Sequence, residues 1–419
     1  MNDPNGLIQW RGRYHLFYQH NPEAATSGAI HWGHALSDDL VRWRDLPLAL
    51  SPTPGAIDES GVWSGCAVDD HGTPTVVYTG MRRGPDDSRT ERPCVATSTD
   101  DDLRTWTKDH RNPVIAAPPP GLDVLGFRDH SVWREDDVWY QAIGSGIRDI
   151  GGIVFLYRSP DLRAWEYVGP LVQGDAIATG EMWECPDFFP LGARHVLMVS
   201  PIPLRKTIYF TGDYRAHQFV PEYQGNVDDG GCFYAPQSFT DAQGRRIMFG
   251  WLRETRDVAA QVAAGWAGVM SLPRLVTPRA DGRIGFTPVP ELQSLRREQT
   301  TDGAALEIEL EIDSGSAAVC GLRVPCTSIV YDASARTLSI GAHATPFALE
   351  PDEPLRLRVF VDHSVVEVFA NDHTCLASRV YPSPAASLAV EPLTDGHSTR
   401  VREFRAWRMD SIWPDWPSS

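Results

Sequence analysis

The sequence lacks any uninterrupted apolar run near the length of about 18 residues that a membrane-spanning helix requires. It also lacks a basic start followed by an apolar stretch, so no signal peptide is visible. We therefore expect no membrane partner, and from this chain alone we expect a cytoplasmic protein. A secreted protein is expected instead if the N-terminus is incomplete.

Cysteine is sparse and shows no metal-binding pattern. The 419 residues include 7 cysteines, and no two of them form a Cys-x-x-Cys pair. No group of cysteine and histidine has the spacing of a zinc site, so we expect neither a metal nor a cofactor. Buried free thiols are the simplest interpretation of these residues. They are Cys66, Cys94, Cys185, Cys232, Cys320, Cys326 and Cys375.

Basic residues are also fewer than acidic residues. Lys and Arg number 38 against 55 Asp and Glu, which gives a formal net charge of −17. This excess argues against nucleic acid and anionic membranes as partners, because both are themselves negatively charged. A neutral substrate is compatible with it.

By contrast, residues typical of strands and turns are abundant. The chain contains 35 Gly and 33 Pro, which interrupt nearly every stretch long enough for a helix. Strand-like runs such as "GRYHLFYQ", "VWYQAIGS" and "RIMFGWL" are frequent, whereas a sustained 3.6-residue apolar period is missing. The composition therefore favours an all-β protein.

A loose repeat runs through the first two-thirds of the chain. An aromatic residue follows a small or acidic turn and opens a strand-like segment at intervals of roughly 60 residues, at Trp43, Trp106, Trp165 and Phe219. A period of this size, filled with short strands, is typical of four-stranded propeller blades. We predict a five-bladed β-propeller over residues 1–290.

A second series of short segments has a similar spacing. Each segment precedes a strand-like run, and the series comprises Asp3, Ser64, Asp129, Glu184 and Tyr234. The innermost strand of each blade lines the propeller axis, so equivalent positions converge although they are far apart in sequence. Three of the five are acids, which predicts a carboxylate cluster at the axis.

The pattern changes near residue 290. The stretch "TPVPELQSLRREQTTDG" contains proline and charge, and we interpret residues 291–302 as a short connector. Beyond it, "ALEIELEI", "LRLRVFVD" and "SVVEVFAN" alternate apolar and polar residues with turns between them. This alternation predicts an antiparallel β-sandwich over residues 303–419.

Retaining glycoside hydrolysis requires two carboxyl groups that face one site. Asp3 lies among hydrogen-bonding groups, Asn2 and Asn5-Gly6, which favour an ionised carboxylate and a nucleophilic role. Glu184 has apolar neighbours, which favour a raised pKa and an acid role. Asp129 follows Arg128, which should keep it ionised to hold sugar hydroxyls. Taken singly, each acid could instead be structural, in an Asx turn or an ion pair.

An ordered set of motifs resembles glycoside hydrolase family 32, the group of invertases, levanases and inulinases. These motifs are "MNDPNG", "LFYQHNP", "HWGHALSDDLVRW", "VWSGCAV", "FRDH", "WECPDFF", "FYAPQSF", "GWAGVMSLPR" and "VFVDHSVVEVFAN". The resemblance covers nearly the whole chain. It implies a five-bladed β-propeller followed by a β-sandwich.

The resemblance also implies roles for single residues. Asp3 would be the nucleophile, Glu184 the general acid/base and Asp129 the transition-state stabiliser. The positions that shape the pocket in the family are matched by Asn2, Gln19, Trp32, Ser64 and Arg128. We add Tyr234 to the predicted substrate-binding residues, because its segment occupies the fifth place in the series.

Three features depart from the family pattern. His130 stands where a proline usually follows Arg-Asp; a titratable ring there could shift the pH optimum or contact an aglycone, or could simply face away. Cys66 stands where a serine is common, so a hydroxyl donor could be lost. The family normally has residues before the nucleophile motif, so we expect a shortened start or an omitted upstream segment.

We therefore predict a retaining, exo-acting β-fructofuranosidase that releases terminal fructosyl units from sucrose or from fructans such as levan and inulin. One alternative is a fructosyltransferase, including a levan fructotransferase that forms difructose anhydride. Others are a fructan-binding protein without catalysis and a related propeller enzyme acting on arabinan or xylan. Linkage preference and oligomeric state are left open.

Overall fold

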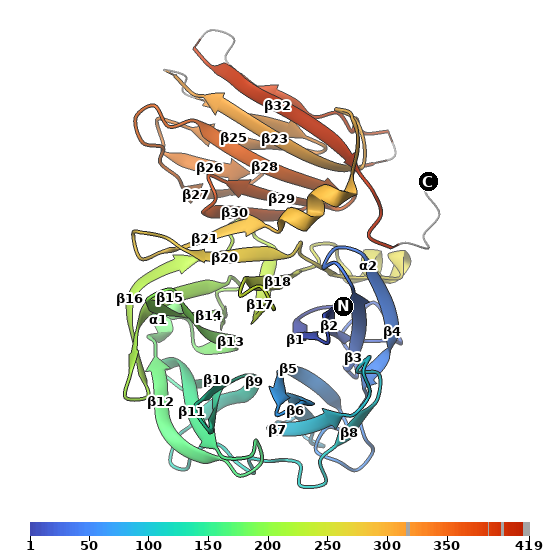
Figure 1. Ribbon diagram of the computed structural model, residues 1–419, viewed down its shortest axis with the longest axis vertical. Helices are drawn as coiled ribbons and strands as arrows, with labels where there is room; N and C mark the ends of the chain where they lie inside the picture. The colour runs from blue at the N-terminus through green and yellow to red at the C-terminus, as the bar shows by residue number, and fades with distance from the viewer. Residues whose placement is uncertain (316–318, 384, 395–397, 414–419) are drawn as a thin grey trace.

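The computed structural model describes residues 1–315, 319–383, 385–394 and 398–413. The described residues before 289 form five antiparallel sheets, which follow one another along the chain. Figure 1 shows them arranged around a common axis, with a separate layered β domain beside the ring. No described helix is long and apolar enough to cross a membrane.

Each of the first four sheets has four strands in chain order. The first two contain β1 (Pro4–Trp10), β2 (Arg13–His20), β3 (His31–Ser37), β4 (Trp43–Leu50), β5 (Gly61–Asp70), β6 (Thr73–Arg83), β7 (Arg89–Ser98) and β8 (Trp106–Lys108). The next two contain β9 (Val124–Glu135), β10 (Val138–Ile147), β11 (Gly151–Ser159), β12 (Glu166–Gln173), β13 (Met182–Leu191), β14 (Arg194–Ile202), β15 (Ile208–Arg215) and β16 (Gln218–Asn226).

The fifth sheet has the order β17-β18-β20-β21, with a short β19 paired to β18. Its strands are β17 (Phe233–Thr240), β18 (Arg246–Leu252), β19 (Val269–Met270), β20 (Arg274–Pro278) and β21 (Ile284–Pro288). Two short helices decorate the ring, α1 (Ala176–Thr179) and α2 (Val258–Ala264). Neighbouring innermost strands contact one another all the way round, and β17 returns to β1, so the ring is closed.

The local sequence explains the tight connections within the sheets. Trp10 pairs with Arg13 across a two-residue loop, in which Arg11 and Gly12 have φ of 49° and 82°. Positive φ at both positions is the type I′ hairpin geometry, which matches the right-handed twist of the flanking strands. The aromatic repeat marks the outer edge of the sheets: Trp43 and Trp106 open β4 and β8, Trp165 precedes β12, and Phe219 lies in β16.

Every innermost strand is interrupted by a change of register. The shifts fall between Asn5 and Ile8 in β1, Trp63 and Gly65 in β5, Glu184 and Asp187 in β13, and Tyr234 and Gln237 in β17, while in β9 they leave Asp129 unpaired. These irregularities are β-bulges, which re-aim side chains next to active sites. The Asn5-Gly6 pair near Asp3 belongs to the first of these bulges.

The second domain is a sandwich of two sheets, with orders β22-β32-β23-β28-β29-β30 and β27-β26-β25-β24-β31. Its elements are the 3₁₀ helix η1 (Pro290–Leu295), β22 (Arg296–Gln299), β23 (Ala305–Asp313), β24 (Val319–Val324), β25 (Thr327–Asp332), β26 (Thr337–Ile340), β27 (His343–Pro346), β28 (Leu355–Asp362), β29 (Val365–Ala370), β30 (Thr374–Arg379), β31 (Glu391–Leu393) and β32 (Arg400–Met409). The predicted propeller followed by a sandwich is confirmed. The segment predicted as a connector contains most of η1 and all of β22, which pairs with β32.

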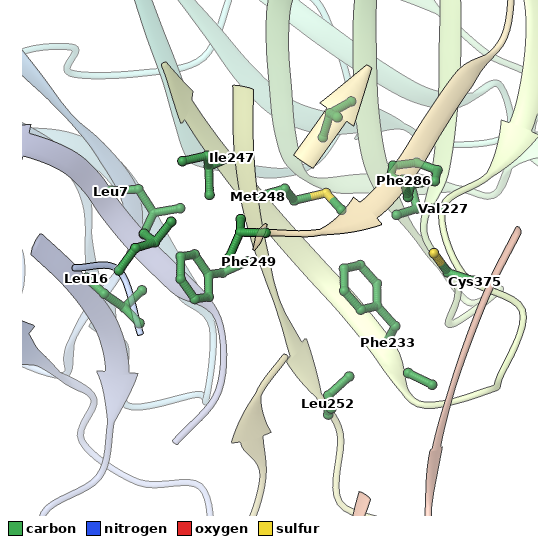
Figure 2. Close-up of a cluster of buried hydrophobic side chains, with 14 of the residues drawn as sticks. Leu7, Leu16, Val227, Phe233, Ile247, Met248, Phe249, Leu252, Phe286 and Cys375 are labelled. Atoms are coloured by element: carbon green, nitrogen blue, oxygen red, sulfur yellow. The ribbon is translucent and has the colours of Figure 1, made fainter. Parts of the chain in front are cut away.

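One apolar core crosses the boundary between the domains. Figure 2 shows Phe233, Leu252 and Phe286 of the propeller near Cys375 of the sandwich, and all four belong to the same buried cluster. The two domains therefore share a hydrophobic core as well as a polypeptide connection.

A buried ion network adds to this shared core. Arg274 of β20 is fully buried. Its Nη2 lies 2.8 Å from Glu367 Oε2 of β29 and 3.0 Å from Asp228 Oδ2. The guanidinium also packs on the rings of Phe233 and Phe369, 4.2 and 5.3 Å from their centroids. One cation thus neutralises two buried carboxylates, one from each domain.

Replacing Arg274 by Met should lower the free energy of unfolding by about 3–5 kcal/mol, because two buried carboxylates lose their cation. Denaturant unfolding of the whole chain measures this loss. The matched control is Arg323→Met, which breaks an exposed pair with Glu391 and should cost about 1 kcal/mol or less. Equal effects of the two substitutions would contradict the prediction.

Candidate active site

The five predicted segments meet at one end of the propeller axis. The Ser64 hydroxyl donates a 2.7 Å hydrogen bond to Asp3 Oδ2. The Cys185 thiol lies 3.7 Å from Asp3 Oδ2 and 3.6 Å from Asp129 Oδ2. The Tyr234 hydroxyl donates a 2.7 Å hydrogen bond to Glu184 Oε2. The carboxylate cluster predicted from the sequence spacing is therefore present.

Asp3 precedes β1 and is held by its neighbours on two strands. Its backbone carbonyl accepts a hydrogen bond from the Gln19 amide at 3.0 Å, and the Asn2 amide donates to the Gln19 carbonyl at 3.0 Å. The side-chain amides of Asn2 and Gln19 each lie 3.3 Å from an Asp3 carboxylate oxygen. These amides and the Ser64 hydroxyl hold the Asp3 carboxylate in a fixed orientation.

Asp129 is held on the other side of the same space. Its backbone has φ of 61° in the bulge of β9, and its amide donates to the Thr79 hydroxyl at 3.0 Å. The Cys185 amide donates to Asp129 Oδ2 at 3.0 Å. Cys185 itself has φ of 48°. Two strained backbone positions, each within a bulge, thus bring β9 and β13 together at this carboxylate.

Glu184 is held by a cation and a phenol. Arg128 Nη2 donates to Glu184 Oε1 at 2.9 Å, while Arg128 Nη1 donates to both oxygens of Glu91 at 2.9 Å. The Arg128 guanidinium also lies 5.7 Å from the ring centroid of Trp63. Arg128 is buried and fixed on several sides, so it can orient Glu184 and still face the axis.

The pKa values of Asp3 and Asp129 differ from the sequence prediction, because both carboxyl groups are buried. Burial raises the pKa of Asp3, and the hydrogen bond from Ser64 lowers it only in part, while the Glu184 charge raises it further. Burial also raises the pKa of Asp129, although Arg128 opposes this. The hydrogen bonds at Asp3 and the charge of Arg128 at Asp129 do favour the ionised forms, as the sequence predicted, but desolvation is the largest effect at both carboxyl groups and raises both pKa values.

His130 faces into the protein. Its Nε2 is 3.1 Å from the Thr79 hydroxyl, and its Nδ1 is 2.8 Å from Gln141 Nε2. Burial lowers the pKa of His130 to about 3, so the ring is neutral near pH 7. Of the interpretations drawn from the sequence, the structure favours the ring that faces away from substrate, since both nitrogens are occupied by buried side chains.

Two other residues considered in the sequence analysis, Trp32 and Cys66, also lie away from the carboxylate cluster. Trp32 is fully buried, and its indole N–H donates to the Trp63 carbonyl at 3.1 Å. The prediction that Trp32 contacts substrate is thus corrected: it can shape the site only by supporting Trp63. Cys66 lies beyond the bulge of β5 and lines a cavity of about 400 Å³ farther along the axis, where no contact joins it to Asp3.

Sequence reasoning missed three residues of this site. Glu91 clamps Arg128, Thr79 joins Asp129 to the Ser64 carbonyl through its hydroxyl at 3.0 Å, and the Cys185 thiol lies between two carboxylates. Glu91 and Thr79 lie on β7 and β6, outside the repeated segments, and carry no motif of their own. Cys185 could have been found, because it adjoins Glu184. Among the described residues, no group of three or more His, Cys, Asp or Glu has an arrangement that could hold a metal ion.

Comparisons with known proteins agree with this geometry. Residues 1–288 match the family model described as the glycosyl hydrolases family 32 N-terminal domain, and residues 280–408 match the model of the family 32 C terminal. The chain is similar to the sucrose-6-phosphate hydrolase of Escherichia coli, with 36% identity over 92% of this chain and 87% of the relative.

A second curated relative is the raffinose invertase of Escherichia coli, which is 36% identical over 91% of this chain and 87% of its own length. Among solved structures, fructan 1-exohydrolase IIa from Cichorium intybus superposes with a TM-score of 0.86 at 28% identity, covering 99% of this chain and 96% of that one. Sequence and fold thus point to the same family.

Proposed function

Since the chain belongs to glycosyl hydrolase family 32 and is a glycosidase of the β-fructofuranosidase type, we propose that it hydrolyses sucrose by a retaining, double-displacement route. Terminal β-D-fructofuranosyl units of fructo-oligosaccharides, levan or inulin are further substrates under this proposal. The reaction needs two carboxylates on one site, one as nucleophile and one as acid and then base.

In the first step, the Asp3 carboxylate attacks C2 of the fructosyl unit. Glu184, in its carboxylic acid form, donates its proton to the leaving oxygen, and a fructosyl-enzyme forms. In the second step, Glu184 as a carboxylate removes a proton from water, which attacks C2 and releases fructose and the free Asp3 carboxylate. The observation that supports this assignment is that the two carboxyl groups face one site, close enough for the Glu184 charge to raise the pKa of Asp3, and that each is fixed by its own donors.

The surrounding residues are assigned to substrate binding. Asp129 and Arg128 would hold ring hydroxyls of the fructosyl unit and stabilise the oxocarbenium-like transition state. Asn2, Gln19 and Ser64 would position Asp3, and Tyr234 would position Glu184. Fixed groups of this kind contribute to catalysis because they need little reorganisation when the reaction occurs.

A substrate panel tests the proposed function. The protein is incubated with sucrose, 1-kestose, inulin and levan, and all products are separated by chromatography. Free fructose as the main product, released first as the β-anomer by NMR, supports retaining hydrolysis. Longer oligosaccharides or a difructose anhydride as the main product would instead support the fructosyltransferase alternative. Calorimetric binding without turnover would contradict an enzymatic function.

Replacing Ser64 by Ala should move the acid limb of the kcat/KM profile to higher pH. The Ser64 hydrogen bond lowers the pKa of Asp3 against the effect of burial, so its loss raises that pKa, and Asp3 is ionised only at higher pH. A hydrogen bond to a charged group is worth about 1.5–3 kcal/mol, which predicts a shift of about one pH unit or more.

The matched control for this experiment is Cys66→Ala, a change of similar size on the same strand that faces the cavity beyond the bulge. Its acid limb should coincide with that of the unmodified protein. An acid limb that stays in place in Ser64→Ala would show that Ser64 does not stabilise the ionised nucleophile.

A further inference from the structure

The side-chain amide of Gln237 lies between three innermost strands of the propeller. Gln237 itself follows the bulge of β17. Its Oε1 accepts a 3.0 Å hydrogen bond from the Leu7 amide of β1, and its Nε2 donates to the Gly65 carbonyl of β5 at 2.9 Å. One neutral side chain of the fifth sheet therefore joins the first sheet to the second.

Both contacts of Gln237 fall where a bulge interrupts a strand. The register shift in β1 leaves Leu7 outside the ladder with β2, and the shift in β5 ends at Gly65. A buried backbone group that leaves its ladder needs another hydrogen-bond partner. An amide side chain offers both a donor and an acceptor, so Gln237 satisfies the backbone of two bulges at once.

The backbone at Gly65 is held from several sides. The Gly65 amide donates to Asn5 Oδ1 at 3.3 Å. A Cβ at Gly65 would lie 2.0 Å from the Val77 carbonyl oxygen, so this backbone packs closely against β6. The preceding residue is Ser64, whose hydroxyl donates to Asp3 Oδ2 at 2.7 Å. The contacts to the Gly65 peptide groups therefore set the position of the Ser64 hydroxyl.

Gln237 also lies between two spaces along the propeller axis. With Ser64, Asp129 and Cys185 it lines a cavity of about 10 Å³, and it also lines the cavity of about 400 Å³ farther along the axis. The smaller space has room for about one water molecule. A substitution that tests Gln237 must therefore keep the size of its side chain, so that additional water does not enter beneath the carboxylates.

We propose that Gln237 is a positioning residue for the nucleophile: it fixes the backbone of Ser64 and Gly65, and thereby the hydrogen bond from Ser64 to Asp3. Gln237 acts through Ser64 and has no role in contacting the substrate. The inference rests on the proposed function, because it concerns the same nucleophile. It gives an uncharged residue of the fifth sheet control over a carboxylate that precedes the first.

Replacing Gln237 by Met keeps the length of the side chain and removes both of its hydrogen bonds. Ser64 is then held less firmly and stabilises the ionised Asp3 less, so the acid limb of the kcat/KM profile should move to higher pH. The expected shift is about half a pH unit, smaller than in Ser64→Ala because the hydroxyl is still present. An acid limb that stays in place would overturn the proposal.

The other titratable groups around Asp3 are the same in this variant. They are Glu184, Asp129, Tyr234 and the Cys185 thiol, from β13, β9 and β17. Gln237→Met changes none of them and introduces no charge. The shift of the acid limb therefore reports the change in hydrogen bonding.

A double variant shows whether Gln237 acts through Ser64. Ser64→Ala combined with Gln237→Met should have the same acid limb as Ser64→Ala alone, because both substitutions weaken one hydrogen bond. Shifts that add in the double variant would mean that Gln237 acts on Asp3 by another route, and would contradict the proposal.

The matched control is Gln9→Met. Gln9 also joins the first sheet to the fifth, since its Oε1 accepts a 2.7 Å hydrogen bond from the Ala242 amide, but it lies at the end of β1 that is farther from Asp3. Both Met variants should unfold at lower denaturant concentration, whereas only Gln237→Met should shift the acid limb. Equal shifts in the two variants would assign the effect to ring closure in general and overturn the proposal.

Gln237→Glu provides a second variant of nearly the same shape. In its acid form the introduced carboxyl group has an O–H donor and a carbonyl acceptor, so it can make both hydrogen bonds, and burial favours this form by raising its pKa. The acid limb should therefore coincide with that of the unmodified protein, while activity falls at higher pH as the carboxyl group ionises. An acid limb displaced as far as in Gln237→Met would contradict the proposal.

A titration without turnover keeps this inference separate from the proposed function. Carbon NMR of the aspartate carboxyl groups measures the pKa of Asp3 directly, and the Asp3 signal is identified by its absence in Asp3→Asn. A higher pKa of Asp3 in Gln237→Met supports the inference even if the protein does not hydrolyse sucrose. An unchanged pKa contradicts it even if sucrose is hydrolysed.

Discussion

Asp3→Asn lowers kcat for sucrose by about 10⁴-fold or more, as expected when a nucleophile is removed and the rest of the site is kept. The side-chain amide has nearly the shape of the carboxylate and can still accept a hydrogen bond from Ser64. It cannot form the covalent bond to C2, so the double-displacement route is closed. The assay is release of glucose and fructose under substrate saturation.

A stability measurement shows whether this loss of activity arises from a loss of folded protein. Denaturant unfolding of Asp3→Asn should resemble that of the unmodified protein or show slightly higher stability, because a buried carboxylate with a raised pKa has been neutralised. Asp38→Asn, at an exposed pair with Arg44, serves as a matched substitution and should keep full activity. If kcat of Asp3→Asn is within about 10-fold of the value for the unmodified protein, Asp3 is not the nucleophile.

Glu184→Gln gives the second large effect, but of a different form. General acid–base catalysis contributes about 10²–10⁴-fold, and both steps of the reaction use this residue. On sucrose, kcat should fall by that amount. On an aryl β-fructofuranoside, whose leaving group needs no proton, the first step should remain fast while the second is slow. The fructosyl-enzyme should then accumulate and appear in the intact mass spectrum as one added fructosyl residue.

Glu181→Gln is the matched control, an exposed glutamate three residues earlier in the same segment. It should show normal turnover and no added mass. Absence of the adduct in Glu184→Gln, together with equal losses on both substrates, would mean that Glu184 holds the structure of the site and does not transfer the proton. Addition of azide gives an independent check, since a small anion needs no base to attack the intermediate.

The sequence was sufficient to predict the ring of sheets and the meeting of three acids, for a simple geometric reason. Each repeated segment occupies the same place in its sheet, so a one-dimensional spacing becomes proximity at the axis. It was not sufficient for groups outside the repeat: Glu91 and Thr79 act on Arg128 and Asp129 from neighbouring strands. Nothing in their local sequence distinguishes them from ordinary strand residues.

Electrostatics was the least predictable property. Local sequence indicated hydrogen-bond donors near Asp3 and a cation beside Asp129, and both are present. The direction of the pKa shifts nevertheless reversed, because desolvation depends on how much of the ring covers each carboxylate. Trp32 shows the same limit for packing, since alternation along β3 could not reveal that Phe17 and Trp63 would cover the indole.

The bulges in β1, β5, β9, β13 and β17 have a consequence for insertions and deletions. Each bulge contains one extra residue. The residues before it place their side chains at the axis, and the residues after it keep their own alternation of inward and outward side chains. Loss of that single residue would exchange inward and outward side chains along the remainder of the strand. Irregular backbone usually tolerates changes in length, but in these five strands it is the position where a change of one residue should be least tolerated.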